Sequence, residues 1–174
     1  MSKLISDLIP IMQQKAIDVV KYCSDSGYPI MIYSTRRTLQ EQAKFYRDGR
    51  SWSQIKYKIT RLNNLGFDFL AEILHDVGPQ MGKYKVTNAG PGESWHNYGE
   101  AFDAAPLVNR KIVWNNDDLW QKYGDAVKIN GLVWGGNFSS FVDKPHAQYR
   151  PGGNPLRLYT PEQIKNLLVR NNAL

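Results

Sequence analysis

Helical and extended patterns alternate irregularly along this chain, and this irregular order is what most constrains its fold. Apolar residues at intervals of three and four predict a first helix. The residues on its core face are Ile5, Leu8, Met12, Ala16, Val19 and Cys23. Pro10 fits this helix if Ser6 or Asp7 starts it, because N–H groups of a first turn have no partner inside the helix.

Glycine, proline and capping signals divide the rest of the chain. Thr38 and Glu41 form a capping box for a second helix, and the residues from Leu62 to Val77 predict another helix. Strands are expected at 30–33 and near 85–87, 101–105 and 111–114. A helix capped by Asp117 follows, and Thr160 opens the last helix. Without a regular strand–helix–strand alternation, we predict an α+β fold with a small, mainly antiparallel sheet flanked by helices.

The length and the cysteine content limit the fold and the metal chemistry. A chain of 174 residues is expected to form one domain, residues 1–174, with its own core. Its single cysteine, Cys23, excludes an internal disulfide framework and a cysteine-rich zinc cluster. We expect Cys23 to be a small buried core residue. Any bound metal must therefore be held by carboxylates and the three histidines.

The chain is basic, with 22 lysines and arginines against 16 acidic residues and a net charge of +6. This balance favours an anionic partner, such as nucleic acid or a carboxylate-rich polymer of a bacterial wall. The basic residues are scattered and form no run, so we predict no nucleic-acid partner.

Polar residues interrupt the N-terminal apolar stretch before it reaches the length of a signal sequence. They are Asp7, Gln13, Gln14, Lys15 and Asp18. No apolar run comes close to the length of about 18 residues that a membrane-spanning helix needs. We therefore expect synthesis in a cytoplasm without a signal peptide, and no stable membrane insertion.

Two histidines have carboxylates at suggestive spacings. His96 precedes Asp103 by seven residues across a glycine turn, and Asp143 precedes His146 by three. A catalytic zinc site needs three protein ligands, an open position for water and a nearby carboxylate that takes the proton from that water. These four residues can fill those roles, although on spacing alone ordinary surface or core histidines are the commoner explanation.

Several motifs resemble those of one peptidase family. Ser94-x-His96-x-x-x-Gly-x-Ala-x-Asp103, followed by Asp143-x-Pro-His146, resembles the signature of zinc peptidases that cut bacterial peptidoglycan. These are the D-Ala-D-Ala carboxypeptidases and the L-alanyl-D-glutamate endopeptidases of phage lysis enzymes, which share a fold with the Hedgehog amino-terminal domain. The stretches 34–42, 86–89 and 134–138 are similar to further family segments, so the resemblance covers roughly residues 28–150.

The resemblance implies a role for each motif residue. His96, Asp103 and His146 would bind one catalytic Zn²⁺, and Asp143 would be the general base. Arg37 would neutralise the oxyanion or bind a substrate carboxylate, whereas its neighbour Arg36 would point elsewhere.

Other residues near these motifs have open or structural roles. Ser94 is either a substrate-binding hydroxyl or a turn residue, and if the segment is extended it faces the same side as His96. Gln148 is a candidate for supporting the metal ligands. Trp95, Tyr98 and Trp134 are expected to be core residues rather than substrate platforms.

Two segments differ from compact family members. Residues 51–82 resemble a helical insertion, which contains His75 as a non-ligand and either adds packing, the commoner case, or covers the cleft. Residues 156–174 are expected to contain the C-terminal helix.

The spelling Asp143-x-Pro-His146 is similar to the L-alanyl-D-glutamate branch, because the carboxypeptidase and dipeptidase branches usually carry Glu-x-x-His. The resemblance therefore implies a monomeric phage endolysin that hydrolyses the L-Ala–D-Glu bond of peptidoglycan and reaches the wall or periplasm through a holin pore. One alternative is a D-Ala-D-Ala carboxypeptidase or dipeptidase. Another is a non-catalytic, zinc-containing wall-binding module, against which the candidate base Asp143 argues.

Overall fold

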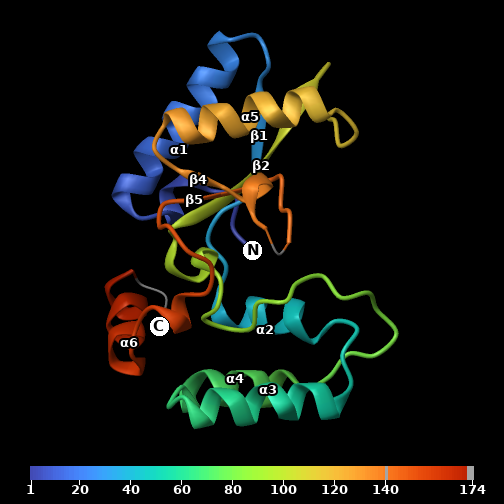
Figure 1. Cartoon of the computed structure of the whole chain (residues 1–174), viewed down its shortest axis with the longest axis vertical. Helices are drawn as coiled ribbons and strands as arrows, with labels where there is room; N and C mark the ends of the chain where they lie inside the picture. Colours follow the sequence, from blue (N-terminus) through green and yellow to red (C-terminus); the bar gives the residue numbers. More distant parts are fainter. Residues whose placement is uncertain (140, 172–174) are drawn as a thin grey trace. The chain divides into compact units, whose positions relative to one another are not determined.

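The computed structural model describes residues 1–139 and 141–171, and their backbone falls into two units (Figure 1). The first unit combines residues 1–36 with 99–151, and the second combines residues 37–98 with the chain from 152 onward. None of the described helices combines the length and the apolar composition that a membrane crossing requires.

An antiparallel sheet forms the centre of the first unit. Its order is β1 (Ile30–Ser34), β2 (Ala101–Val108), β5 (His146–Gln148) and β4 (Val133–Trp134), and β3 (Lys111–Ile112) pairs with β2. Every pairing is antiparallel. The predicted α+β class with a small antiparallel sheet is therefore confirmed.

Two helices pack together and share one apolar core with this sheet (Figure 1). They are α1 (Pro10–Asp25) and α5 (Asp117–Ile129). The expected start of the first helix at Ser6 or Asp7 is wrong: both lie in a separate 3-10 turn, and Pro10 is the first residue of α1. A proline is accommodated there because it has no N–H to leave unbonded. Asn116, rather than Asp117, caps α5 by accepting a hydrogen bond from the Leu119 N–H.

Helices dominate the second unit. They are α2 (Leu39–Arg47), α3 (Trp52–Asn64), α4 (Asp68–Val77) and α6 (Pro161–Arg170), with 3-10 turns at Trp95–Tyr98 and Pro155–Arg157. The capping box predicted at Thr38 is formed, and Thr160 caps the last helix as predicted, with Gln163 completing a capping box there too. The last helix starts at Pro161, directly after its predicted cap Thr160, and residues 172–174 of the segment expected to contain it lie outside the described residues.

Two expectations for the second unit are wrong. The single helix from Leu62 to Val77 is two helices, because Gly66 adopts a φ of +79° that other residues rarely adopt. Leu65, which follows Leu62 at a helical spacing and would lie on the apolar face of such a helix, is 55% exposed. Residues 85–87 form no strand in the described structure, because this stretch of backbone pairs with no strand of the sheet.

Cys23 lies on the core face of α1 and is fully buried, as expected. Burial raises the pKa of its thiol to about 12, because the core disfavours the thiolate. We therefore expect an aromatic disulfide reagent to label native protein only as fast as the first unit opens, and to label urea-unfolded protein at once. Rapid labelling of one thiol per native chain would contradict this burial.

Candidate metal and peptidase site

Asp103 and His146 face each other in the first unit. Asp103 on β2 is the direct partner of His146 on β5, and residues directly opposite in an antiparallel pair project from the same face. The Asp103 Oδ1 atom lies 3.2 Å from His146 Nδ1, and both side chains are largely buried. The sheet register therefore brings together two of the three predicted ligands.

The surroundings of His146 favour a positive charge. Burial lowers the pKa of His146, but the hydrogen bond and charge of Asp103, together with the charge of Asp143, outweigh burial and raise the pKa above its usual value. A carboxylate oxygen and an imidazole nitrogen that face each other are also atoms that commonly ligate Zn²⁺. These residues fit the predicted metal, which would take the place of a proton at Nδ1.

Asp143 lies in the loop that leads into β5. Its N–H donates to the Gly135 carbonyl over 3.0 Å, and its own carbonyl accepts from the His146 N–H over 3.1 Å. A Cβ atom added at Gly135 would lie 2.5 Å from the Asp143 carbonyl oxygen and 2.9 Å from His146 Cβ. Only glycine fits at position 135, because the backbone of Asp143 comes so close to it. Gly135 therefore allows the Asp143 loop to lie beside His146.

Trp134 supports the same loop from the core. Its indole Nε1 donates to the Lys144 carbonyl over 2.7 Å, and Cβ atoms at Gly124 or Gly136 would each lie 2.3 Å from the ring. Trp134, Trp95 and Tyr98 are all buried, which confirms them as core residues.

The second unit holds His96, Ser94 and Arg37. His96 is 2% exposed, and its carbonyl accepts from the Arg37 N–H over 3.1 Å. Ser94 and His96 were expected to face the same side if their segment were extended, but the segment is not extended. A 3-10 turn begins at Trp95, and the Ser94 carbonyl accepts from the Asn97 N–H over 3.0 Å.

The Arg37 guanidinium is held by a residue that sequence reasoning missed. Arg37 Nη1 donates to Gln42 Oε1 over 2.9 Å, and its guanidinium carbon lies 4.8 Å from the Phe45 ring centroid. Gln42 is fully buried, and its amide nitrogen donates to the Ala89 carbonyl over 2.7 Å. In the sequence, Gln42 stands five residues after Arg37 within the family-like stretch 34–42, and this position was the signal that could have indicated it. Arg36 belongs to the other unit, where its carbonyl accepts from the Ser2 N–H.

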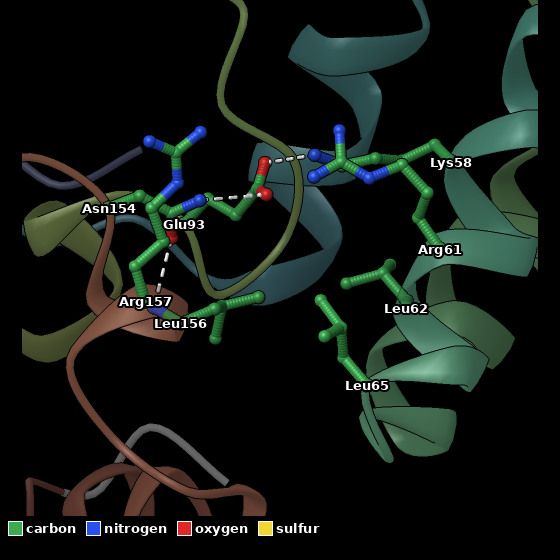
Figure 2. A pocket seen from close by; sticks show the side chains of 8 residues that line it. All are labelled: Lys58, Arg61, Leu62, Leu65, Glu93, Asn154, Leu156 and Arg157. Carbon is green, nitrogen blue, oxygen red and sulfur yellow. Dashed lines mark hydrogen bonds and ion pairs between the residues drawn. The ribbon is translucent and has the colours of Figure 1, made fainter.

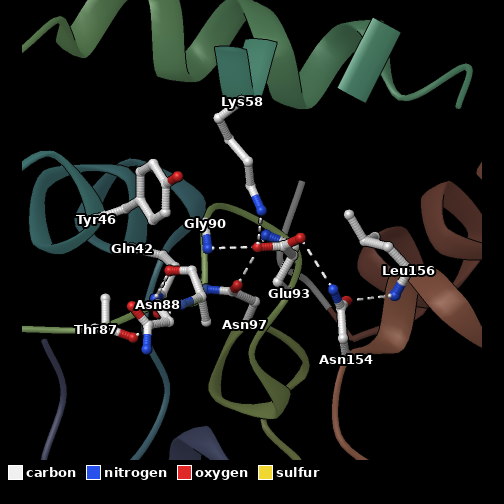
Figure 3. A network of polar contacts seen from close by, with 12 residues as sticks. Gln42, Tyr46, Lys58, Thr87, Asn88, Gly90, Glu93, Asn97, Asn154 and Leu156 are labelled. Carbon is white, nitrogen blue, oxygen red and sulfur yellow. Dashed lines mark hydrogen bonds and ion pairs between the residues drawn. The ribbon is translucent and has the colours of Figure 1, made fainter. Parts of the chain in front are cut away.

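A largely buried carboxylate, that of Glu93, joins three segments of the second unit (Figure 3). Its Oε2 atom accepts from the Gly90 N–H over 2.7 Å and from the Lys58 ammonium, and its Oε1 atom accepts from the Asn154 amide over 2.9 Å. Glu93 directly precedes Ser94 and lies three residues before His96. Its contacts therefore connect α3 and the segment around Asn154 to the loop that leads to His96. No short-range sequence signal marks this network.

Figure 2 shows a pocket beside this network. Its lining residues are Lys58, Arg61, Leu62, Leu65, Glu93, Asn154, Leu156 and Arg157. The volume of about 30 Å³ holds about one water molecule, which is too small for a peptide stem. His75, also in the 51–82 segment, has a side chain 65% exposed, and its ring centroid lies 5.7 Å from that of Trp52.

The site residues thus fall into two groups. Asp103, Asp143 and His146 lie together in the first unit, and Arg37, Ser94 and His96 belong to the second. Their roles as ligands, base and substrate contacts remain predictions.

Comparison with known proteins supports the resemblance seen in the motifs. A family described as D-alanyl-D-alanine carboxypeptidase matches residues 87–149, a span that contains His96, Asp103, Asp143 and His146. The peptidoglycan L-alanyl-D-glutamate endopeptidase CwlK of Bacillus subtilis (strain 168) is 28% identical over 155 residues, which cover 84% of this chain and 75% of CwlK. The chain is thus similar to D-alanyl-D-alanine carboxypeptidases over residues 87–149 and to CwlK over most of its length.

Other relatives and structural neighbours are either longer than this chain or less similar to it. The L-alanyl-D-glutamate peptidase of Listeria phage A118 is 34% identical over 137 residues, which cover 78% of this chain but only 35% of the phage protein. Among solved structures, the L-Ala D-Glu endopeptidase ChiX of Serratia marcescens has a TM-score of 0.45 and 14% identity, covering 83% of this chain and 81% of ChiX. DacB of Streptococcus pneumoniae D39 has a TM-score of 0.49 and 17% identity, covering 91% of this chain and 72% of DacB.

Proposed function

We propose that this chain is a zinc peptidase that hydrolyses the peptide stems of bacterial peptidoglycan at the L-Ala–D-Glu bond. The observation that carries the proposal is the Asp103–His146 pair, 3.2 Å apart, with Asp143 on the loop that enters β5. Two relatives named for L-alanyl-D-glutamate cleavage, CwlK and the phage A118 peptidase, support this choice of bond.

The proposed ligands of one Zn²⁺ are His96, Asp103 and His146. Asp103 and His146 come from adjacent strands, and His96 stands seven residues before Asp103 in the family motif. When bound, zinc supplies Lewis acidity, which lowers the pKa of a coordinated water to about 7.

The chain's own residues provide the remaining chemistry. Asp143 takes the proton from the attacking water and delivers it to the nitrogen of the departing D-Glu residue, so the proton count balances when the amide bond breaks. Arg37, held by Gln42, stabilises the negative charge on the L-Ala carbonyl oxygen or binds a stem carboxylate. Ser94 is proposed as a substrate-binding hydroxyl.

We further propose a monomeric phage endolysin, made in the host cytoplasm and released to the wall through a holin pore. The two units would act as one peptidase domain. The net charge of +6 suits a substrate whose stems carry carboxylates, and the proposal includes no nucleic-acid partner.

The first test is cleavage of isolated peptidoglycan, followed by mass spectrometry of the released fragments. We expect stem peptides with a new N-terminal D-Glu, lost with a chelator and restored by zinc. The matched controls are His146→Ala, which should be inactive, and His75→Ala, which should be active.

Other products would support other members of the family. The description of the matching family favours carboxypeptidase activity as the second candidate, and release of free D-Ala would establish it. Zinc binding without cleavage of any wall would instead indicate a wall-binding module.

A further inference from the structure

We propose that Gln148 is a positioning residue that holds the proton of His146 on Nε2 and thereby reserves Nδ1 for the metal. This inference rests on the proposed metal site, which includes His146. Gln148 would contact the metal ligand His146 and not the metal ion itself.

The sheet places Gln148 beside the ring. His146 and Gln148 are two residues apart on β5, so both side chains project from the same face. β5 lies between β2 and β4, and the partner of Gln148 on β2 is Ala101, whose small side chain leaves room for the longer one. Gln148 is 2% exposed, and its Oε1 atom lies 3.0 Å from His146 Nε2.

A backbone carbonyl decides which way the Gln148 amide faces. The Gln148 side-chain nitrogen donates to the Arg150 carbonyl over 2.6 Å. Because a carbonyl oxygen only accepts, the amide nitrogen must face Arg150 and the amide oxygen must face His146. An amide oxygen also only accepts, so His146 Nε2 must carry a hydrogen.

The Arg150 carbonyl is itself held in place. The Arg150 Nε atom donates to Glu100 Oε2 over 2.7 Å, and the Tyr149 N–H donates to the Glu100 carbonyl over 2.9 Å. Glu100 is 2% exposed and directly precedes β2. A chain of hydrogen bonds therefore links the buried Glu100 carboxylate, through Arg150 and Gln148, to the His146 imidazole.

The opposite ring nitrogen faces the other proposed ligand. His146 Nδ1 lies 3.2 Å from Asp103 Oδ1, so an Nδ1 lone pair and a carboxylate oxygen can bind the same ion. Without the acceptor at Gln148, a neutral ring would instead keep its proton on Nδ1, where Asp103 accepts it, and that tautomer cannot bind zinc through Nδ1. Loss of such a supporting contact typically weakens metal affinity about 10- to 100-fold.

Three variants of the full chain test this role. Gln148→Met removes the acceptor at similar side-chain length, whereas Gln148→Glu keeps an oxygen that can accept from Nε2. Gln13→Met is the control, because Gln13 also donates to a backbone carbonyl of the first unit, that of Leu8 over 2.7 Å. Zinc affinity is measured by competition with a chromophoric chelator, and ¹⁵N NMR of the zinc-loaded protein reports which ring nitrogen of His146 carries hydrogen.

We expect hydrogen on Nε2 and zinc on Nδ1 in the unaltered chain. Gln148→Met should weaken zinc binding about 10- to 100-fold, Gln148→Glu should recover most of that loss, and Gln13→Met should bind zinc like the unaltered chain. Zinc on Nε2, or unchanged affinity in Gln148→Met, would overturn the inference while leaving the proposed function intact. An unaltered chain that binds no zinc would contradict the proposed function itself, and the inference with it.

Discussion

Replacing Asp143 by asparagine is expected to slow peptidoglycan cleavage by at least about 10²-fold while one zinc ion per chain remains bound. The asparagine amide has nearly the shape of the carboxylate but cannot accept the proton of the attacking water. The backbone contacts of this position, to Gly135 and His146, involve only main-chain atoms and should persist. The variant therefore separates the proposed base from the proposed ligands.

The measurement compares fragment release with zinc content after dialysis. His146→Ala is expected to lose both activity and zinc, because it removes a proposed ligand. His75→Ala should lose neither, since the His75 side chain is 65% exposed and contacts Asp76 and Trp52. An active Asp143→Asn variant would mean that another group is the base.

Replacing Lys58 by methionine is expected to lower the free energy of unfolding by about 3 kcal/mol. Lys58 and Glu93 form an ion pair with side chains only 11% and 10% exposed. Burial lowers the pKa of Lys58 even though the charge and hydrogen bond of Glu93 raise it. Without the ammonium, the largely buried Glu93 side chain would lose its ionic partner in the described part of the network.

Urea titration followed by tryptophan fluorescence measures this loss. Lys56→Met is the matched control, because Lys56 is exposed on the same helix and rests over the Trp52 ring at 5.5 Å. The double variant Lys58→Met with Glu93→Gln should recover part of the stability, since it removes the uncompensated charge. Equal midpoints for Lys58→Met and the unaltered chain would show that the ion pair contributes nothing to folding.

Local signals predicted the parts of the fold that depend on neighbouring residues. The capping boxes at Thr38 and Thr160 mark true helix starts, because a cap and its partner lie within one turn. Gly66 shows the limit of predicting helices from apolar spacing. Leu62 and Leu65 have the spacing of one helix face, but α3 ends at Asn64, and the left-handed backbone of Gly66 separates it from α4. β5 was not predicted because three residues, His-Ala-Gln, are too few to show a strand pattern.

The site divides in the same way. Sequence motifs indicated His96, Asp103, Asp143 and His146, and the register of β2 against β5 shows why two of these meet. The contacts that hold the site residues depend on long-range approach, as between Gln42 and Ala89 or between Lys58 and Glu93. Such pairs have no local spacing rule, so only the folded structure reveals them.

The burial of Cys23 has a practical use in attaching probes to this protein. Because the chain has a single cysteine and its thiol is enclosed by the core, a new cysteine at an exposed position would be the one readily accessible thiol. A fluorophore or a surface linker could then be joined at a chosen residue without first removing Cys23. Keeping the native thiol also avoids opening a cavity beneath α1.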